Sequence, residues 1–162
     1  INIMELGFYR FANKEPNKLA IVGPNEELVS RGELLSKANK LTHALRDLGL
    51  KKFDTVAVVL PNSVEYFVVY MACLQAGFYL VPINWHLAGP EIAYILEDSE
   101  AKAFIASGKN PDMEKACINA VSEISFDKKG CITIDELEGF RHIETLPNLC
   151  LMKILMTDRQ DK

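Results

Sequence analysis

The sequence contains few residues that could form a metal site or a set of disulfide bonds. Its four cysteines and three histidines are scattered and include no C-x-x-C pair: Cys73, Cys117, Cys131 and Cys150, and His43, His86 and His142. Structural zinc sites take closely spaced pairs of ligands, so this spacing predicts no metal ligand. We instead expect buried or free thiols, which are typical of a reducing compartment, and we assign the chain to the cytoplasm.

The sequence also lacks an excess of positive charge. It has 18 lysine and arginine residues against 22 aspartate and glutamate residues, which gives a net charge of −4. Nucleic acids and anionic membrane surfaces are bound through basic stripes, so this balance argues against either as the main partner. No signal peptide is expected, because the first residues form no apolar stretch. The chain opens with Ile1 rather than Met, and we therefore expect a piece of a longer protein.

Long hydrophobic runs are scarce. One uncharged run, residues 66–83, reaches the lower length for a membrane-spanning helix. Gly77 and Pro82 interrupt this run, since both residues break helices. The run therefore predicts a buried helix over residues 63–76 and a buried strand over residues 78–81, and no transmembrane segment.

No glycine-rich nucleotide loop is recognisable. None of the nine glycines is separated from another by a single residue, so the dinucleotide fingerprint is absent. The turn Ser107-Gly108-Lys109 faintly resembles a phosphate loop, but Ala103 stands where the first glycine of that loop belongs. No serine or cysteine has a recognisable base partner. We therefore predict no catalytic, cofactor-binding or metal-binding residue in this chain.

The apolar pattern begins with a β-hairpin and a helix. Two short runs, 19–22 and 27–30, flank the turn formers Gly-Pro-Asn, which is typical of a hairpin. Ser30 and Glu33 then form a capping box, and the apolar positions that follow have helical spacing. Gly49 is placed to end this helix.

Short apolar strands then alternate with amphipathic helices. Strands are predicted at 55–60, 78–81, 103–106 and 131–134, with helices that start near residues 63, 90 and 111. Asn62 with Glu65 is expected to cap the first of these helices, and Asp135 a brief helix after the last strand. The order predicts an α/β fold, a mostly parallel sheet with helices on both faces, preceded by a β-hairpin. We expect one α/β subdomain over residues 1–140 and an atypical tail over residues 141–162.

The segment from Val81 to Leu87 is the best candidate for a binding site. It follows the carboxyl end of a predicted central strand and contains the only tryptophan of the chain. Ligands of parallel sheets bind beyond the carboxyl ends of the strands. We therefore name Asn84, Trp85 and His86 as candidate residues of a substrate pocket. The alternative is a buried aromatic turn that packs under the next helix.

Four stretches in a fixed order resemble one enzyme family. They are LVSRGELLSKANKLTHALRDLGL (28–50), DTVAVVLPNSVEY (54–66), MACLQAGFYLVPINWHL (71–87) and EIAYILEDSEAKAFI (91–105). Their patterns are similar to the amino-terminal part of acyl-CoA synthetases, the fatty-acid–CoA ligases of the adenylate-forming (AMP-binding) superfamily. The resemblance extends over about residues 6–140.

The resemblance implies the first subdomain of the adenylate-forming fold. For the full-length form it implies an enzyme that joins a fatty or other carboxylic acid to CoA through acyl-AMP, with ATP and Mg²⁺. The family's Ser/Thr/Gly-rich phosphate loop is expected shortly after Arg141, but the tail has no such sequence. We therefore expect a ligase fragment that is inactive alone, holds none of these cofactors and self-associates through its truncated edge.

Two other interpretations remain open from the sequence. One is a non-catalytic α/β interaction module that keeps the scaffold and has lost the chemistry. The other is a nucleotide-binding regulatory domain, which the positions of the glycines disfavour.

Overall fold

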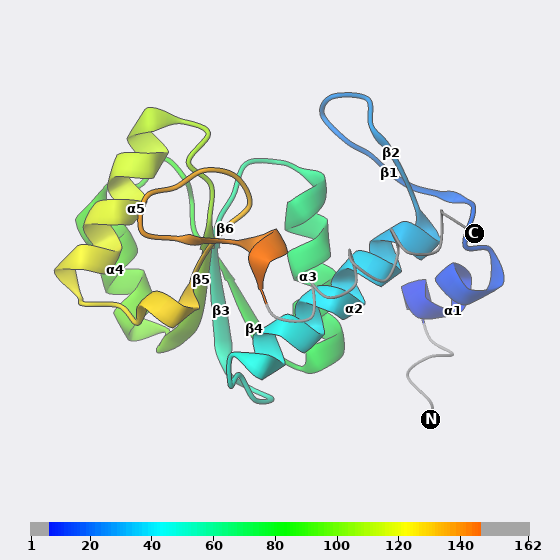
Figure 1. The fold of residues 1–162 in the computed structure, drawn as a ribbon, viewed down its shortest axis with the longest axis horizontal. Helices are drawn as coiled ribbons and strands as arrows, with labels where there is room; N and C mark the ends of the chain where they lie inside the picture. The colour runs from blue at the N-terminus through cyan, green and yellow to red at the C-terminus, as the bar shows by residue number, and fades with distance from the viewer. Residues whose placement is uncertain (1–6, 147–162) are drawn as a thin grey trace.

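The computed structural model describes residues 7–146, which form a hairpin region followed by alternating strands and helices (Figure 1). Helix α1 (Gly7–Lys14) precedes the hairpin β1 (Leu19–Val22) and β2 (Leu28–Ser30), and α2 (Arg31–Asp47) follows it. The alternating part consists of β3 (Thr55–Val59), α3 (Val64–Ala76), β4 (Tyr79–Pro82), α4 (Gly89–Asp98), β5 (Ala101–Ala106), α5 (Pro111–Glu123) and β6 (Cys131–Thr133). The 3-10 helix η2 (Lys128–Gly130) leads into β6, and β7 (Arg141–His142) and η3 (Ile143–Thr145) complete the described part.

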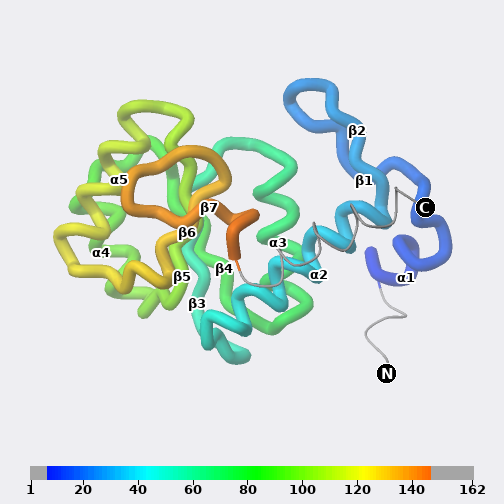
Figure 2. The backbone as a smooth tube through the Cα atoms, in the orientation of Figure 1, coloured from blue at the N-terminus to red at the C-terminus, as the bar shows by residue number. Residues whose placement is uncertain are grey.

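The main sheet has five strands in the order β4-β3-β5-β6-β7, and every neighbouring pair is parallel. Strands β1 and β2 form a separate antiparallel pair. Helices α2 and α3 cover one face of the main sheet, and α4 and α5 cover the other. Figure 2 shows the hairpin and α1 at the far end of α2, away from the main sheet. These observations confirm the predicted α/β fold with a preceding hairpin.

Two hydrophobic cores lie on the two faces of the sheet, because successive strand residues point to opposite sides. In β3, Val56 and Val58 belong to the core with α2 and α3, whereas Ala57 and Val59 belong to the core with α4 and α5. Every residue of β3 is buried, as expected for a central parallel strand. The fully buried ring of Phe104, from β5, is among the largest side chains of the second core.

Helix α2 begins and ends as the sequence predicts. The Ser30 hydroxyl accepts a hydrogen bond from the N–H of Glu33 at 3.2 Å, and the Glu33 carboxylate accepts one from the N–H of Ser30 at 2.8 Å. At the other end Gly49 has a φ of +100°, and the N–H of Leu50 donates to the carbonyl oxygen of Leu45 at 3.2 Å. This is a capping box at the start and a Schellman motif at the end.

Three local predictions were wrong. Strand β4 is not buried, because it lies at the edge of the sheet, where the Tyr79 side chain is 58% exposed. Ser63 rather than Asn62 caps α3, and its hydroxyl accepts from the N–H of Tyr66 at 3.2 Å. No helix follows Asp135 before β7 in the described part, because the carboxylate instead binds groups on and after two strand ends.

Helix α1 was not predicted, because eight residues are too few for a clear apolar period. Its Tyr9 is buried, and the Tyr9 hydroxyl donates to the carbonyl oxygen of Met71 at 3.4 Å. This contact joins α1 to α3 across 62 positions of the sequence. Long-range packing of this kind, rather than local sequence, stabilises α1.

The described residues also bear on the predicted absence of a transmembrane segment and on the predicted tail from residue 141. Among residues 7–146, no helix is both long enough and apolar enough to span a bilayer. Strand β7 belongs to the main sheet, and Leu146 is fully buried in the core with α2 and α3. Residues 147–162, with Cys150, lie outside the described residues, and the boundary between residues 140 and 141 stays a prediction.

Candidate functional site

A hollow of about 420 Å³ lies at the carboxyl edge of the main sheet. It is lined by residues that follow β3, β4 and β5: Pro61, Asn62, Trp85, Lys109, Asn110 and Met113. Loops at this edge of a parallel sheet converge because the carboxyl ends of neighbouring parallel strands lie side by side. The hollow combines an aromatic ring, two amide side chains and one cation, which suits a ligand with a flat or apolar body and a negative charge.

Of the three residues predicted from the sequence, Trp85 lines the hollow. The Asn84 side chain instead accepts a hydrogen bond from the N–H of His86 at 3.0 Å, and the Asn84 carbonyl oxygen accepts one from the N–H of Leu87 at 3.1 Å. Asn84 therefore forms the turn that presents Trp85. The rings of Trp85 and His86 lie next to each other, with centroids 3.5 Å apart. All three side chains are exposed, so the segment is not a buried aromatic turn.

Three lining residues were not predicted from the sequence: Asn62, Lys109 and Asn110. Lys109 is the only cation in the hollow. Asn110 is the N-cap of α5, and its side-chain oxygen accepts from the N–H of Asp112 at 2.9 Å. The signal that could have found these residues is positional, since each lies within a few residues of the end of a predicted strand.

A network of hydrogen bonds around Asp135 holds the turn that carries Lys109. The Asp135 carboxylate accepts from the Ser107 hydroxyl at 2.5 Å, from the N–H of Gly108 at 2.7 Å and from the Thr133 hydroxyl at 3.0 Å. The Ser107 hydroxyl in turn accepts from the N–H of Lys109 at 3.2 Å. Ser107 and Thr133 are almost completely buried, at 0% and 1% exposure, and the network ties the ends of β5 and β6 together through the half-buried Asp135.

Close packing at Gly108 fixes the same turn. A Cβ atom at this position would lie 2.0 Å from the carbonyl oxygen of Glu136, a backbone atom that cannot move away cheaply. Only glycine fits such a contact. The turn thus has both a steric reason and a hydrogen-bonding reason to keep one conformation, and it presents Lys109 to the hollow in that conformation.

The cysteines do not supply a nucleophile among residues 7–146. Burial raises the pKa of Cys73 and of Cys117 to about 12, and burial together with Asp127 raises the pKa of Cys131 to about 11. All three are free thiols, as the sequence predicts, and they stay protonated near neutral pH. No group of three or more histidine, cysteine, aspartate or glutamate side chains could hold a metal ion in this part of the chain.

Comparison with known proteins identifies the family. Residues 8–147 match the AMP-binding enzymes. The fatty acid–[acyl-carrier-protein] ligase ScoC of Streptomyces coeruleorubidus is 33% identical over 105 residues, which are 64% of this chain and 20% of ScoC. The long-chain-fatty-acid–CoA ligase FadD13 of Mycobacterium tuberculosis is 36% identical over 95 residues, which are 58% of this chain and 19% of FadD13.

A solved structure shows the same relationship in three dimensions. The benzoate CoA ligase of Burkholderia xenovorans LB400 aligns with a TM-score of 0.72 and 26% identity over 85% of this chain and 26% of the ligase. The chain spans about a fifth of the length of ScoC and of FadD13. Because the family match extends over most of its residues, this chain belongs to the family of AMP-binding enzymes.

Proposed function

We propose that this chain is the amino-terminal scaffold of a ligase that activates a fatty or other carboxylic acid. The match of residues 8–147 to the AMP-binding enzymes carries the proposal, and two relatives named as fatty-acid ligases support the substrate class. In the proposed reaction a carboxylate oxygen attacks the α-phosphorus of ATP. Pyrophosphate leaves, and a thiol then attacks the acyl carbon and releases AMP. CoA is the proposed source of that thiol, and three buried free thiols are in keeping with a cytoplasmic enzyme.

The hollow that contains Trp85 offers too few groups to hold a triphosphate and its metal ion. The hollow has one cation, Lys109, and no carboxylate among its lining residues. Phosphoryl and nucleotidyl transfer depend on several cations, backbone amides and Mg²⁺ around the developing charge. We therefore propose that residues 1–162 form one wall of the active site and that the groups that hold ATP, Mg²⁺ and CoA belong to the rest of a longer enzyme.

Pyrophosphate release tests this proposal directly. Residues 1–162 and the protein of the full open reading frame are each incubated with ATP, Mg²⁺, CoA and a panel of carboxylic acids. We expect turnover from the long protein and none from residues 1–162 above a control without protein. Turnover by residues 1–162 would refute the scaffold role. A long protein inactive with every acid would refute the ligase role and favour the interaction module.

We also propose that the segment Asn84-Trp85-His86 borders the bound carboxylic acid. Trp85 lines the hollow, so the part of the fluorescence that Trp85→Phe removes reports on this site. In the long enzyme we expect substrate acids to quench this fluorescence in a saturable manner. We expect Trp85→Ala to raise KM for the acid more than it lowers kcat, because a wall of the pocket contributes uniform binding. Unchanged KM would remove Trp85 from the substrate site.

We further propose that residues 1–162, produced alone, self-associate through α3 rather than through β4, which is one of the two edge strands of the main sheet. The N–H groups of Tyr79 and Ile83 donate inward to β3, so the outward positions of β4 are Leu80 and Pro82. Proline has no N–H, which leaves a poor edge for strand pairing.

The outer face of α3, by contrast, exposes three large apolar side chains at helical spacing. Phe67, Tyr70 and Leu74 are 49%, 46% and 58% exposed. We expect light scattering after size-exclusion chromatography to show concentration-dependent dimers that Tyr70→Lys abolishes. Tyr94→Lys, at an exposed tyrosine of α4, is the matched control and should leave the dimers intact. A monomer at every concentration would refute the proposal.

A further inference from the structure

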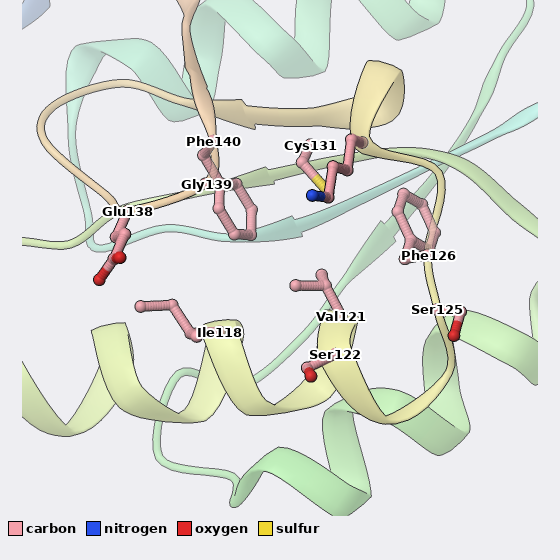
Figure 3. Close-up of a pocket in the computed structure, with 10 residues that line it drawn as sticks. Ile118, Val121, Ser122, Ser125, Phe126, Cys131, Glu138, Gly139 and Phe140 are labelled. Carbon is pink, nitrogen blue, oxygen red and sulfur yellow. The ribbon is translucent and has the colours of Figure 1, made fainter.

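A second hollow, of about 530 Å³, lies between α5 and the segments on either side of β6 (Figure 3). Figure 3 shows Ile118 and Val121 rising from α5 toward the rings of Phe126 and Phe140. These four side chains form apolar walls, and the volume lies within the range of small-molecule sites. The hollow therefore has the size and the lining of a ligand pocket.

This pocket is separate from the candidate functional site. Its floor contains Cys131, the first residue of β6, and one wall contains Phe140, the residue before β7. The pocket thus lies beside β6, on the side of the sheet that α5 covers, and it shares no lining residue with the hollow that holds Trp85.

The aromatic walls of the pocket are fixed by one core side chain. The fully buried ring of Phe104 contacts the ring of Phe140 edge-on, with centroids 5.8 Å apart, and the ring of Phe126 edge-on at 6.4 Å. The turn before β6 is equally constrained, since a Cβ atom on Gly130 would lie 2.3 Å from the carbonyl oxygen of Lys102. The pocket is therefore formed before any ligand binds, which reduces the entropy lost on binding.

The charged groups of the pocket are Lys128 and Glu138. Lys128 belongs to η2, just before the floor residue Cys131, and Glu138 belongs to the loop between β6 and β7. Figure 3 shows Glu138 at the end of the pocket near Ile118, away from Phe126. A cation and an anion thus stand in different parts of an otherwise apolar hollow.

We propose that this pocket binds an amphipathic monoanion, a medium-length aliphatic carboxylate, with its head group at Lys128 and its chain against Ile118, Val121 and Phe140. The apolar walls bury the chain, and the ammonium group pairs with the single carboxylate. Glu138 repels a second negative charge and so disfavours dicarboxylates. This site is additional to the proposed acid-activating site and does not depend on ligase activity.

Titration of ¹⁵N-labelled residues 1–162 with octanoate, followed by NMR, tests the proposal. We expect saturable shifts at the amides of Ile118, Val121 and Phe140, and no shift of the Trp85 indole N–H. Lys128→Met should weaken binding about threefold to fivefold, the effect of a partly exposed ion pair. Lys129→Met is the matched control, because this neighbouring lysine does not line the pocket, and it should leave the affinity unchanged.

Two further measurements make the result decisive. Octanamide and octanedioate should both bind more weakly than octanoate, since the first lacks the charge and the second adds one. Val121→Trp should abolish the shifts by filling the pocket, and an unchanged circular dichroism spectrum would show that this variant folds. The absence of saturable shifts at these amides, or equal affinity for octanoate and octanamide, would overturn the proposal.

Discussion

Removal of the Asp135 carboxylate should loosen the carboxyl edge of the sheet. This side chain accepts hydrogen bonds from the Ser107 hydroxyl, the Gly108 N–H and the Thr133 hydroxyl. Asp135→Ala leaves all three donors without this acceptor. Ser107 and Thr133 are so deeply buried that water cannot readily replace the lost acceptor.

The magnitude follows from the cost of unsatisfied buried donors. Each such donor costs about 1–3 kcal/mol, and hydroxyl groups recover part of this cost by rotating toward other acceptors. We therefore expect Asp135→Ala to lower the free energy of unfolding by about 2–4 kcal/mol. Asp135→Asn retains one acceptor oxygen and the shape of the side chain, so it should cost only about 1 kcal/mol.

Urea unfolding of residues 1–162, followed by far-ultraviolet circular dichroism, measures both effects. Glu136→Ala is the matched control, since Glu136 is an exposed neighbouring carboxylate whose side chain takes no part in the network. This control should change the free energy of unfolding by less than about 0.5 kcal/mol. If Asp135→Ala were no more destabilising than Glu136→Ala, the carboxylate would not be holding the turn, and the argument for a preorganised Lys109 would fail.

Three further predictions concern steric fit, pH dependence and thiol reactivity. Gly108→Ala should destabilise the fold by about 2–4 kcal/mol in the same urea assay, because the new Cβ meets backbone. Gly23→Ala, which meets only a flexible side chain, should cost less, and equal losses would contradict the packing argument. The hydrogen bonds of the α2 capping box hold the pKa of Glu33 below its ordinary value. Their contribution to the free energy of unfolding is therefore fully present at a pH above the ordinary pKa, and it is lost as the pH falls through the lowered pKa. In the acid range the free energy of unfolding should therefore change less with pH for Glu33→Gln than for the unchanged chain. An unchanged pH profile would exclude this contribution. Because burial raises the pKa of Cys73 and Cys117 to about 12, iodoacetamide at pH 8 should label these thiols slowly in the folded chain and rapidly in urea. Peptide mass spectrometry measures both labelling rates. Fast labelling without urea would contradict the buried positions.

The candidate site could be predicted only in part, and the residues involved show why. Trp85 was found because it follows a predicted strand and is the only tryptophan of the chain. Lys109 was placed in a turn without a recognisable phosphate loop and Asn110 was not singled out, since nothing local shows that this turn lies beside the loop after β4. The role of Asp135 was missed for a related reason, because its partners Ser107 and Gly108 are 28 and 27 residues away. A preference for capping was the only signal visible at position 135.

The sequence by itself determined the order of the strands and helices from β1 to β6, the cap of α2 at Ser30, its end at Gly49, and the α/β class. These features depend on groups within a few residues of one another or on the alternation of apolar runs, and such short-range effects can be read along the chain. The tertiary structure alone decided that β4 lies at an edge of the sheet, that Asp135 ties β5 to β6, and which residues line the two hollows. Those outcomes arise from groups brought together by folding over distances of many residues, where burial and packing in three dimensions determine which contacts form.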